Sequence, residues 1–352
     1  MARRALNLVD GRLYAHHPVM QQVRIEPFTL QREYLVELNG LRVPNKYDCA
    51  VERGDAPGTG KHWGLFWYFN DVASRWYACW LHHAAVKSGL RIEIPELPII
   101  DDEYMEHTAI YQAVLRSDAR RPFVVVEIGA RWGTWAARAV AFARAQRPLQ
   151  RSWAHMVEPR WVHCDAIGKL MAHNGFANYS LDCANVQTAS LRSWLKNVSH
   201  VDVMDVDIQG AESGLLPAIR PSLERKVYRL VIATHSPSIH RALRKEFRSW
   251  VSIWDVDHQR DGQCVTKYLR GYGAKTGERF NFTALLEKGC YHDSPFGPVA
   301  HFDGELILDN PRFVNQSRVF SPFDTELKID ELLPRRPRES PHLSRSEPTE
   351  AT

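Results

Sequence analysis

The stretch Phe123–Gly133, which reads FVVVEIGARWG, constrains the fold more than any other part of the chain. Its four leading apolar residues are followed by the acid Glu127 and by two glycines, Gly129 and Gly133, four positions apart. A short apolar run that ends in glycines is typical of a buried parallel strand that enters a tight turn. We therefore predict a strand, a glycine turn and then a helix over residues 134–146.

The turn in this stretch has the E-x-G-x-x-x-G spacing of S-adenosylmethionine (SAM) sites. Glycine lets the backbone approach a ligand where a Cβ atom would clash, and the free N–H groups of the following helix face the same point. Glu127 ends the strand, where a carboxylate can meet a cationic or hydroxyl-bearing ligand. A nicotinamide dinucleotide would need a G-x-G-x-x-G spacing, which is absent from this turn. Another nucleotide, or a strand and helix without a ligand, is the alternative.

The composition is that of a soluble globular protein, with 44% hydrophobic residues among 352 and a formal net charge of only +4. This near balance argues against a strong polyanion binder. No apolar run approaches the ~18 residues of a membrane span, and no hydrophobic signal core follows the N-terminus. The six cysteines have no C-x-x-C pair, which favours free thiols in a reducing compartment. They are Cys49, Cys79, Cys164, Cys183, Cys264 and Cys290. We therefore expect a cytoplasmic protein without membrane contact.

From about residue 101 the chain alternates between predicted strands and helices. After the strand at Phe123, strands are expected at residues 154–157, 179–181, 201–206, 228–233, 250–254 and 305–308. Repeated units of this length imply right-handed crossovers and helices on both faces of a sheet. The predicted fold is α/β, with a doubly wound, mostly parallel, seven-stranded Rossmann-like sheet.

Three further segments accompany this sheet, which we assign to residues 101–320. Residues 1–100 form an N-terminal extension, and its aromatic run is either a core helix or a lid over a substrate pocket. Residues 257–302 are a polar insertion that either closes over a substrate or is a surface excursion. In residues 334–352, Pro, Arg, Ser and Glu dominate, which predicts a disordered tail.

Five successive strands each deliver a polar group to one edge of the predicted sheet. These groups are Glu127, Glu158, Asp182, Asp207 and His235. Because ligands bind outside the carboxyl ends of parallel strands, we expect the five groups to line one site. Glu158 suits the two hydroxyls of a ribose, whereas Asp182 is placed to reach an adenine edge or to cap a turn.

The last two of these groups are the candidates for catalysis. His235 is the better candidate for a base or an acceptor-orienting residue, because the ordinary pKa of histidine lies near neutrality. Asp207 is the second candidate, and a structural histidine is the competing interpretation. A divalent metal bound by Asp205, Asp207 and His235 is a further alternative, although we expect no metal.

Taken together, these motifs resemble the FkbM-type SAM-dependent methyltransferases, over about residues 101–319. The resemblance is carried by E-x-G-A-x-x-G at 127–133, Glu158-Pro159, D-x-x-G-A-E at 207–212, Thr234-His235-Ser236 and the stretch 303–313. Gln209 departs from the family, which commonly has Glu at this position, so a role that needs a third carboxylate is in doubt.

The resemblance implies a class I methyltransferase domain with an antiparallel last strand. It implies transfer of a methyl group from SAM to a hydroxyl of a small molecule or sugar. It places Glu127, Gly129, Ala130 and Gly133 at the cofactor, Glu158 on the ribose and Asp207 beside the methyl donor. A catalytically silent SAM-binding module that serves a protein or RNA partner is the alternative. A nucleic-acid acceptor is not expected, because the Asn/Asp-Pro-Pro-aromatic stretch of amino-methylating enzymes is absent after the fourth strand.

Overall fold

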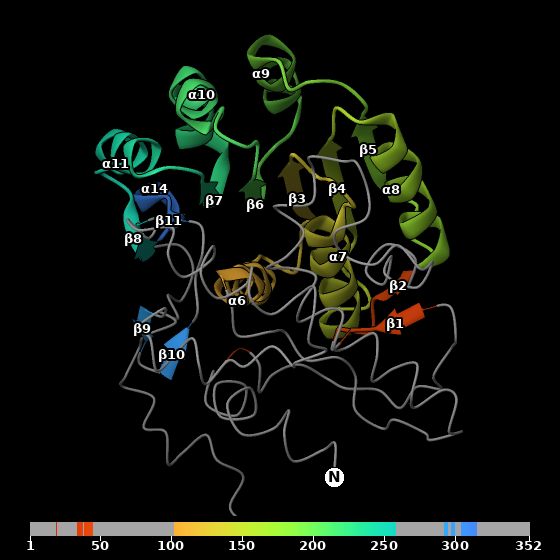
Figure 1. Ribbon diagram of the computed structural model, residues 1–352. Coiled ribbons are helices and arrows are strands. Elements are labelled where there is room, and N and C mark those ends of the chain that lie inside the picture. The colour runs from red at the N-terminus through yellow and green to blue at the C-terminus, as the bar shows by residue number, and fades with distance from the viewer. Residues whose placement is uncertain are drawn as a thin grey trace, which may run out of the picture.

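A computed structural model describes residues 19, 34–37, 39–44, 102–257, 292–294, 297–299 and 304–314. Its centre is a seven-stranded sheet with helices on both faces, as the alternating sequence predicts (Figure 1). The strands are β3 (Phe123–Ile128), β4 (Ser152–Val157), β5 (Tyr179–Asp182), β6 (Val201–Val206), β7 (Val227–Thr234), β8 (Val251–Val256) and β11 (Gly304–Asp309). Their order in the sheet is β5-β4-β3-β6-β7-β11-β8.

Every strand of this sheet except β11 runs in the same direction. β3 pairs in parallel with β4 and with β6, and the parallel pairing continues to β5 on one side and to β7 on the other. β11 is antiparallel to both β7 and β8. The doubly wound, mostly parallel sheet and its antiparallel last strand are therefore confirmed.

The two faces of the sheet carry different helices. One face packs against α6 (Asp102–Arg116), α7 (Thr134–Gln146) and α8 (Trp161–His173), and the other against α9 (Thr188–Asn197), α10 (Glu212–Lys226) and α11 (Pro237–Glu246) (Figure 1). β3 is an interior strand and is buried along its whole length, so all of its residues except Glu127 are apolar, on both faces. Phe123 and Val125 belong to the first core, whereas Val124 and Val126 belong to the second.

The helix predicted over residues 134–146 is present as α7, and further helices follow the other strands. α7 has the predicted bounds, whereas α10 runs on to Lys226 although it contains Pro217 and Pro221. Leu216 and Leu223 of α10 are fully buried in the second core. Tertiary packing of the apolar face therefore outweighs the weak local helix signal.

A short hairpin of the N-terminal extension packs on the first helical layer. It consists of β1 (Tyr34–Val36) and β2 (Arg42–Pro44), which pair antiparallel. Arg138 of α7 forms a buried ion pair with Glu37 at 2.8 Å. The backbone N–H of Arg42 donates to Asn174 Oδ1, just after α8, at 2.9 Å. The hairpin is thereby tied to both helices.

The aromatic run, the insertion and the C-terminal tail lie mostly outside the residues that the structure describes. The aromatic run of the N-terminal extension and the C-terminal tail lie outside the described residues. Of the insertion, only Asp257, directly after β8, and a hairpin of β9 (His292–Ser294) and β10 (Gly297–Val299) are described. α14 (Pro311–Val314) follows β11. Among the helices that are described, none has the length and apolarity that crossing a bilayer requires.

Candidate functional site

The strand order of the sheet reverses at β3. From β3 the chain adds β4 and β5 on one side, then returns to add β6 and β7 on the other. In open α/β sheets, ligands bind at such a switch point, outside the carboxyl ends of the strands. The five predicted site residues all lie at this edge, because each belongs to the end of β3, β4, β5, β6 or β7 or directly follows it.

The glycine turn after β3 is determined by contacts within the protein. Gly129 has a φ of +85°, and a Cβ atom added there would lie 1.8 Å from the carbonyl oxygen of Asp207. Gly133 has a φ of +69°, and its added Cβ would lie 3.0 Å from Ile167. Ala130, between them, is buried. Backbone geometry and packing therefore require both glycines whether or not a ligand binds, which the sequence pattern alone did not reveal.

Glu127 faces helix α7. Its Oε2 accepts a hydrogen bond from the Ala136 N–H at 2.8 Å, and its Oε1 accepts one from the Trp135 N–H at 3.4 Å. These donors belong to the first turn of α7, whose free N–H groups we expected to face a ligand. Glu127 is only 2% exposed, and burial raises its pKa to about 8. Its contact with a cofactor stays a prediction.

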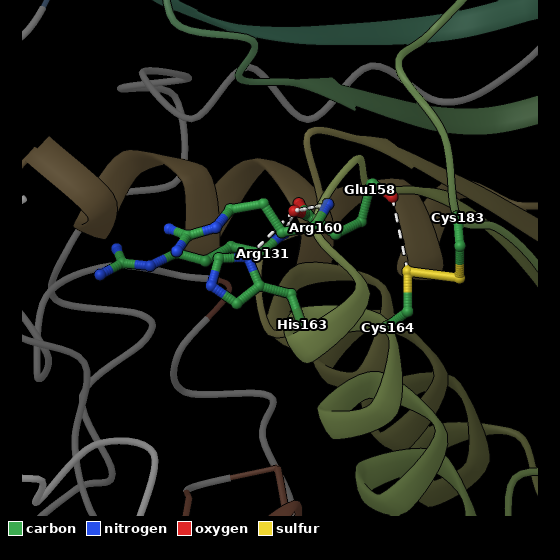
Figure 2. The surroundings of a disulfide bond; sticks show 6 residues. All are labelled: Arg131, Glu158, Arg160, His163, Cys164 and Cys183. Atoms are coloured by element: carbon green, nitrogen blue, oxygen red, sulfur yellow. Dashed lines mark hydrogen bonds and ion pairs between the residues drawn. A yellow bond between two sulfur atoms is a disulfide. The ribbon is translucent and has the colours of Figure 1, made fainter.

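Glu158 organises the first of two polar clusters, which we call the Glu158 cluster; it consists of Arg131, Glu158, Arg160 and His163 (Figure 2). Oε2 accepts the Arg131 N–H at 2.8 Å, and Oε1 accepts the Arg160 N–H at 2.9 Å. His163 Nδ1 lies 3.0 Å from the same Oε1. Burial has the largest effect on the pKa of Glu158 and acts to raise it, but the His163 and backbone hydrogen bonds outweigh burial and hold this pKa below its usual value.

The Glu158 carboxylate, whose side chain is 5% exposed, keeps one acceptor position that the described residues do not use. Each carboxylate oxygen has two lone pairs. Oε1 accepts from both Arg160 and His163, whereas Oε2 accepts only from Arg131 among the residues that the structure describes. One lone pair of Oε2 is therefore not used by these residues, and the carboxylate is held in place by three donors.

A disulfide joins this cluster to the end of β5. Cys164 of α8 is bonded to Cys183, which directly follows Asp182, and their Cα atoms are 6.0 Å apart (Figure 2). The prediction of free thiols is therefore wrong for these two cysteines, and the other four lie outside the described residues. The parallel pairing of β4 with β5 brings the helix after β4 to the end of β5, which the spacing in the sequence does not show. The Asp182 side chain is 55% exposed, and its Oδ2 lies 3.8 Å from His155 Nε2.

The second cluster lies at the ends of β6 and β7, and we call it the His235 cluster; it consists of Asp207, Gln209, Glu212 and His235. His235 Nδ1 lies 3.0 Å from Glu212 Oε1, and its Nε2 lies 3.1 Å from Asp207 Oδ1. Gln209 donates to Asp207 Oδ1 at 3.0 Å, and its amide nitrogen lies 2.8 Å from His235 Nε2. The structure therefore brings together both predicted catalytic residues.

Glu212 fixes the shape of this cluster. Its Oε1 accepts the backbone N–H groups of Ile208 at 3.0 Å and Gly210 at 3.2 Å, in addition to its contact with His235. Glu212 is fully buried. The Asp207 side chain is 43% exposed, so a small molecule can reach it from solvent.

The two carboxylates favour a cationic His235, whereas the Gln209 amide nitrogen, which is itself a donor and lies 2.8 Å from Nε2, opposes a proton on that ring nitrogen. Burial has the largest effect and lowers the pKa of His235, but the hydrogen bonds and charges of Asp207 and Glu212 together raise this pKa to about 10. Burial likewise acts to raise the pKa of Glu212, but the His235 hydrogen bond and nearby backbone N–H groups hold it below its usual value. The near-neutral pKa on which we chose His235 as a base is therefore wrong for this environment. The catalytic roles of His235 and Asp207 stay predictions.

The same side chains could also bind a metal ion. Asp207, Glu212 and His235 each offer a ligand atom, and these atoms lie within 4.8 Å of one another. Both ring nitrogens of His235 face carboxylates, so an ion would have to replace one of these contacts. Asp205, which the sequence analysis grouped with them, is not part of this set; it is buried in β6 and pairs in register with Glu127.

The sequence analysis missed His163 and Arg131 and assigned no role to Glu212. Glu212 was visible as the last acid of the D-x-x-G-A-E run. Arg131 and Gln209 have φ values of +46° and +54°, which non-glycine residues rarely adopt and which gather at functional sites. They are the only described non-glycine residues with positive φ, and one lies in each cluster. This distribution supports treating both loops as parts of a site.

The sequence matches no protein-family model and no curated protein sequence. Several solved methyltransferase structures show a weak structural similarity to part of this chain. The bifunctional kinase-methyltransferase WbdD has a TM-score of 0.36 and 9% identity over 60% of this chain and 42% of its own. An rRNA methylase from Streptococcus thermophilus has a TM-score of 0.36 and 12% identity over 58% of this chain and 94% of its own. Precorrin-6y C5,15-methyltransferase from Geobacter metallireducens has a TM-score of 0.33 and 10% identity over 57% of this chain and 86% of its own.

This chain thus spans less than half the length of WbdD. At these identities and TM-scores the similarity carries no argument about this chain, whose fold is defined by its own strand order and pairing. The resemblance to FkbM-type enzymes stays a prediction from the sequence motifs, since no family model matches.

Proposed function

We propose that this protein is a SAM-dependent O-methyltransferase that transfers a methyl group to a hydroxyl of a small molecule or sugar. The observation that supports this best is the pair of polar clusters on either side of the strand switch point. One cluster is suited to hold a ligand, and the other contains a partly exposed carboxylate next to a histidine. The glycine turn after β3 lies between the two clusters, and Gly129 in this turn packs directly on the backbone of Asp207.

The Glu158 cluster fits the adenosine end of SAM. The free lone pair on Glu158 Oε2 can accept a hydrogen bond from a ribose hydroxyl, and the three donors around the carboxylate keep it ionised and oriented. Asp182, at the end of the next strand, has an exposed side chain that can accept from the amino group of an adenine. On this proposal Glu127, Gly129, Ala130 and Gly133 shape the turn that the cofactor contacts.

The His235 cluster fits the acceptor. When bound, SAM supplies an electrophilic methyl group, so the protein has to position a hydroxyl oxygen and take up its proton. Asp207 can accept that hydrogen bond and then the proton, because its carboxylate is partly exposed. His235, as a cation, holds the carboxylate of Asp207, and Glu212 holds His235. On this proposal His235 orients the base, and Asp207 is the base.

Calorimetric titration with SAM tests the cofactor. We expect micromolar binding to the wild type and at least tenfold weaker binding to Glu158→Gln, because the amide has one acceptor oxygen where the carboxylate has two. Glu224→Gln is the matched control, since Glu224 is an acid of α10 that pairs with Arg220 away from this edge. Absence of binding to a folded wild type would refute the proposal, as would equal binding to both variants.

A transfer assay tests the acceptor class. Wild type and Asp207→Asn are incubated with methyl-labelled SAM and a panel of sugars and phenolic or aliphatic alcohols. Label in an alkali-stable ether, lost in Asp207→Asn, is the expected result. SAM binding without transfer to any hydroxyl would favour the silent binding module instead.

A further inference from the structure

We propose that the Cys164–Cys183 disulfide is a redox switch for the cofactor end of the site, and that the oxidised protein binds SAM more tightly than the reduced protein. The identity of the ligand rests on the proposed function. The coupling between the disulfide and Glu158 is a property of the protein alone and can be measured without any ligand.

Both ends of the disulfide contact Glu158 or its hydrogen-bond partner. Cys164 Sγ lies 3.4 Å from the backbone carbonyl oxygen of Glu158. On the other side, the Glu158 N–H donates to the carbonyl oxygen of Asp182 at 3.0 Å, and Cys183 is the next residue. Glu158 therefore lies between the two segments that the disulfide joins (Figure 2).

The first turn of α8 depends on this arrangement. His163, whose Nδ1 faces the Glu158 carboxylate, is adjacent to Cys164 in the helix. Arg160, at the N-cap, makes no side-chain cap hydrogen bond, but its backbone N–H donates to Glu158. The helix start is thus held to Glu158 by hydrogen bonds and to β5 by the disulfide.

The β5 side of the disulfide is weakly held by other contacts. Within the described part of the chain β5 is the edge strand and pairs only with β4, and its four residues are half-buried or exposed, with Tyr179 and Leu181 packed against the first core. Segments with few buried contacts open at low free energy, so a covalent link there has a large effect on order. Without it, the loop after Asp182 can move away from α8 and take the partner of the Glu158 N–H with it.

The chemistry of the switch is thiol–disulfide exchange with a dithiol. Cys183 is exposed, whereas Cys164 is only 4% exposed, so an incoming thiolate meets the Cys183 sulfur first. Its attack forms a mixed disulfide and releases Cys164 as a thiolate, which takes up a proton. The second thiol of the reductant then attacks the mixed disulfide and displaces Cys183 as a thiolate, which takes up a proton. The reductant leaves as a cyclic or protein disulfide. An oxidised dithiol reverses both steps.

SAM titration of the oxidised, reduced and reoxidised full-length protein tests the switch. Dithiothreitol is the reductant, and mass spectrometry of peptides establishes the state of the two cysteines. We expect affinity to fall at least tenfold on reduction and to return on reoxidation. Cys183→Ser should bind like the reduced wild type and not respond to dithiothreitol, whereas Asn185→Ser, in the same exposed loop, should behave like the wild type. Thermal unfolding of both variants confirms that they are folded.

Three results would overturn the switch: equal affinity in both states, free thiols at both positions in the oxidised protein, or a Cys183→Ser variant that still responds to dithiothreitol. If neither state binds SAM, the proposed function fails, and amide hydrogen exchange at Glu158 and Arg160 then decides the coupling. Faster exchange of these two amides on reduction supports the switch, and unchanged exchange refutes it.

Discussion

Glu127, Glu158 and Glu212 are buried glutamates at one edge of the sheet, and among the described residues only Glu158 and Glu212 face a histidine. Glu158 and Glu212 each accept two backbone N–H groups and lie 3.0 Å from a histidine Nδ1, and the pKa of each is below its usual value. Glu127 accepts two backbone N–H groups of α7 and faces no histidine among the described residues, and burial raises its pKa to about 8. At Glu158 and Glu212 the histidine adds to the backbone donors in offsetting burial, whereas at Glu127 burial outweighs the backbone donors and the charge of Arg138.

The two histidine-paired clusters differ in a second way. Glu158 distributes its three donors over both oxygens, whereas Glu212 accepts all three on Oε1. The His235 cluster also has a second acid, Asp207, and this acid further favours a cationic His235. We infer that the two clusters differ in role. The Glu158 cluster keeps a carboxylate lone pair that a ligand can use, and the His235 cluster places a cationic ring between two carboxylates.

The largest expected effect comes from the residue that separates the clusters. In Gly129→Ala, the new Cβ meets the Asp207 carbonyl and the backbone keeps a left-handed φ, so both loops must move. We expect unfolding in urea to show a loss of roughly 3–5 kcal/mol, combining overpacking with left-handed strain. Gly175→Ala is the control, because its φ is +66° but no atom lies within 4 Å of the added Cβ. It should lose only about 1 kcal/mol, and equal losses in the two variants would contradict the packing argument.

Removing the charge of Glu212 should have the next largest effect. Glu212→Gln leaves His235 with one carboxylate and buries an amide N–H₂ group, and we expect a loss of about 2–3 kcal/mol in the free energy of unfolding. Glu158→Gln, made for comparison, should lose less, because Glu158 faces one histidine and, among the described residues, no second acid belongs to its cluster. A larger loss for Glu158→Gln would reverse our ranking of the clusters.

The charge of His235 makes the stability of its cluster depend on pH. Its pKa in the folded protein is about 10, above the ordinary 6.5, so the stabilisation is complete below pH 6.5 and is lost as the pH rises through 10. NMR titration of the ring protons should therefore show no change between pH 5 and 8 in the wild type. In Glu212→Gln the pKa should fall but stay above 6.5, because Asp207 remains. A wild-type midpoint near 6.5 would show that the carboxylates do not hold His235 as a cation.

The sequence predicted the edge of the sheet but not how its side chains pair. The apolar runs of β3, β4 and β6 end in acids, so the positions of Glu127, Glu158 and Asp207 could be read from local pattern. The contacts of His163 and the disulfide of Cys164 depend on where α8 lies against β5, and no local pattern encodes that. The raised pKa of His235 needs both neighbouring carboxylates and the degree of burial, which only the folded chain defines.

Per pH unit, a smaller effect is expected at the glutamate that has no histidine among the described residues. The folded pKa of Glu127 lies above its ordinary value, so its contribution to stability is complete below pH 4.5 and is lost as the pH rises through about 8. Between those values the wild type should lose stability relative to Glu127→Gln, by on the order of 1 kcal/mol per pH unit at most. Urea unfolding at pH 5, 6.5 and 8 measures this slope. A difference that does not change with pH would mean that Glu127 is ionised in the folded protein.

The smallest expected effect comes from a third carboxylate at the His235 cluster. Gln209 is exposed and lies beside both Asp207 and His235, and Gln209→Glu supplies the acid that FkbM-type proteins commonly have. Because the new charge is exposed and lies between a cation and an anion, stability should change by less than about 1 kcal/mol. The pKa of His235 should nevertheless rise, while Gln209→Ala should leave it nearly unchanged. If NMR titration found the highest pKa of His235 in Gln209→Ala, hydrogen bonding by the Gln209 amide and not carboxylate charge would determine this pKa. The argument that a cationic His235 holds Asp207 would then fail.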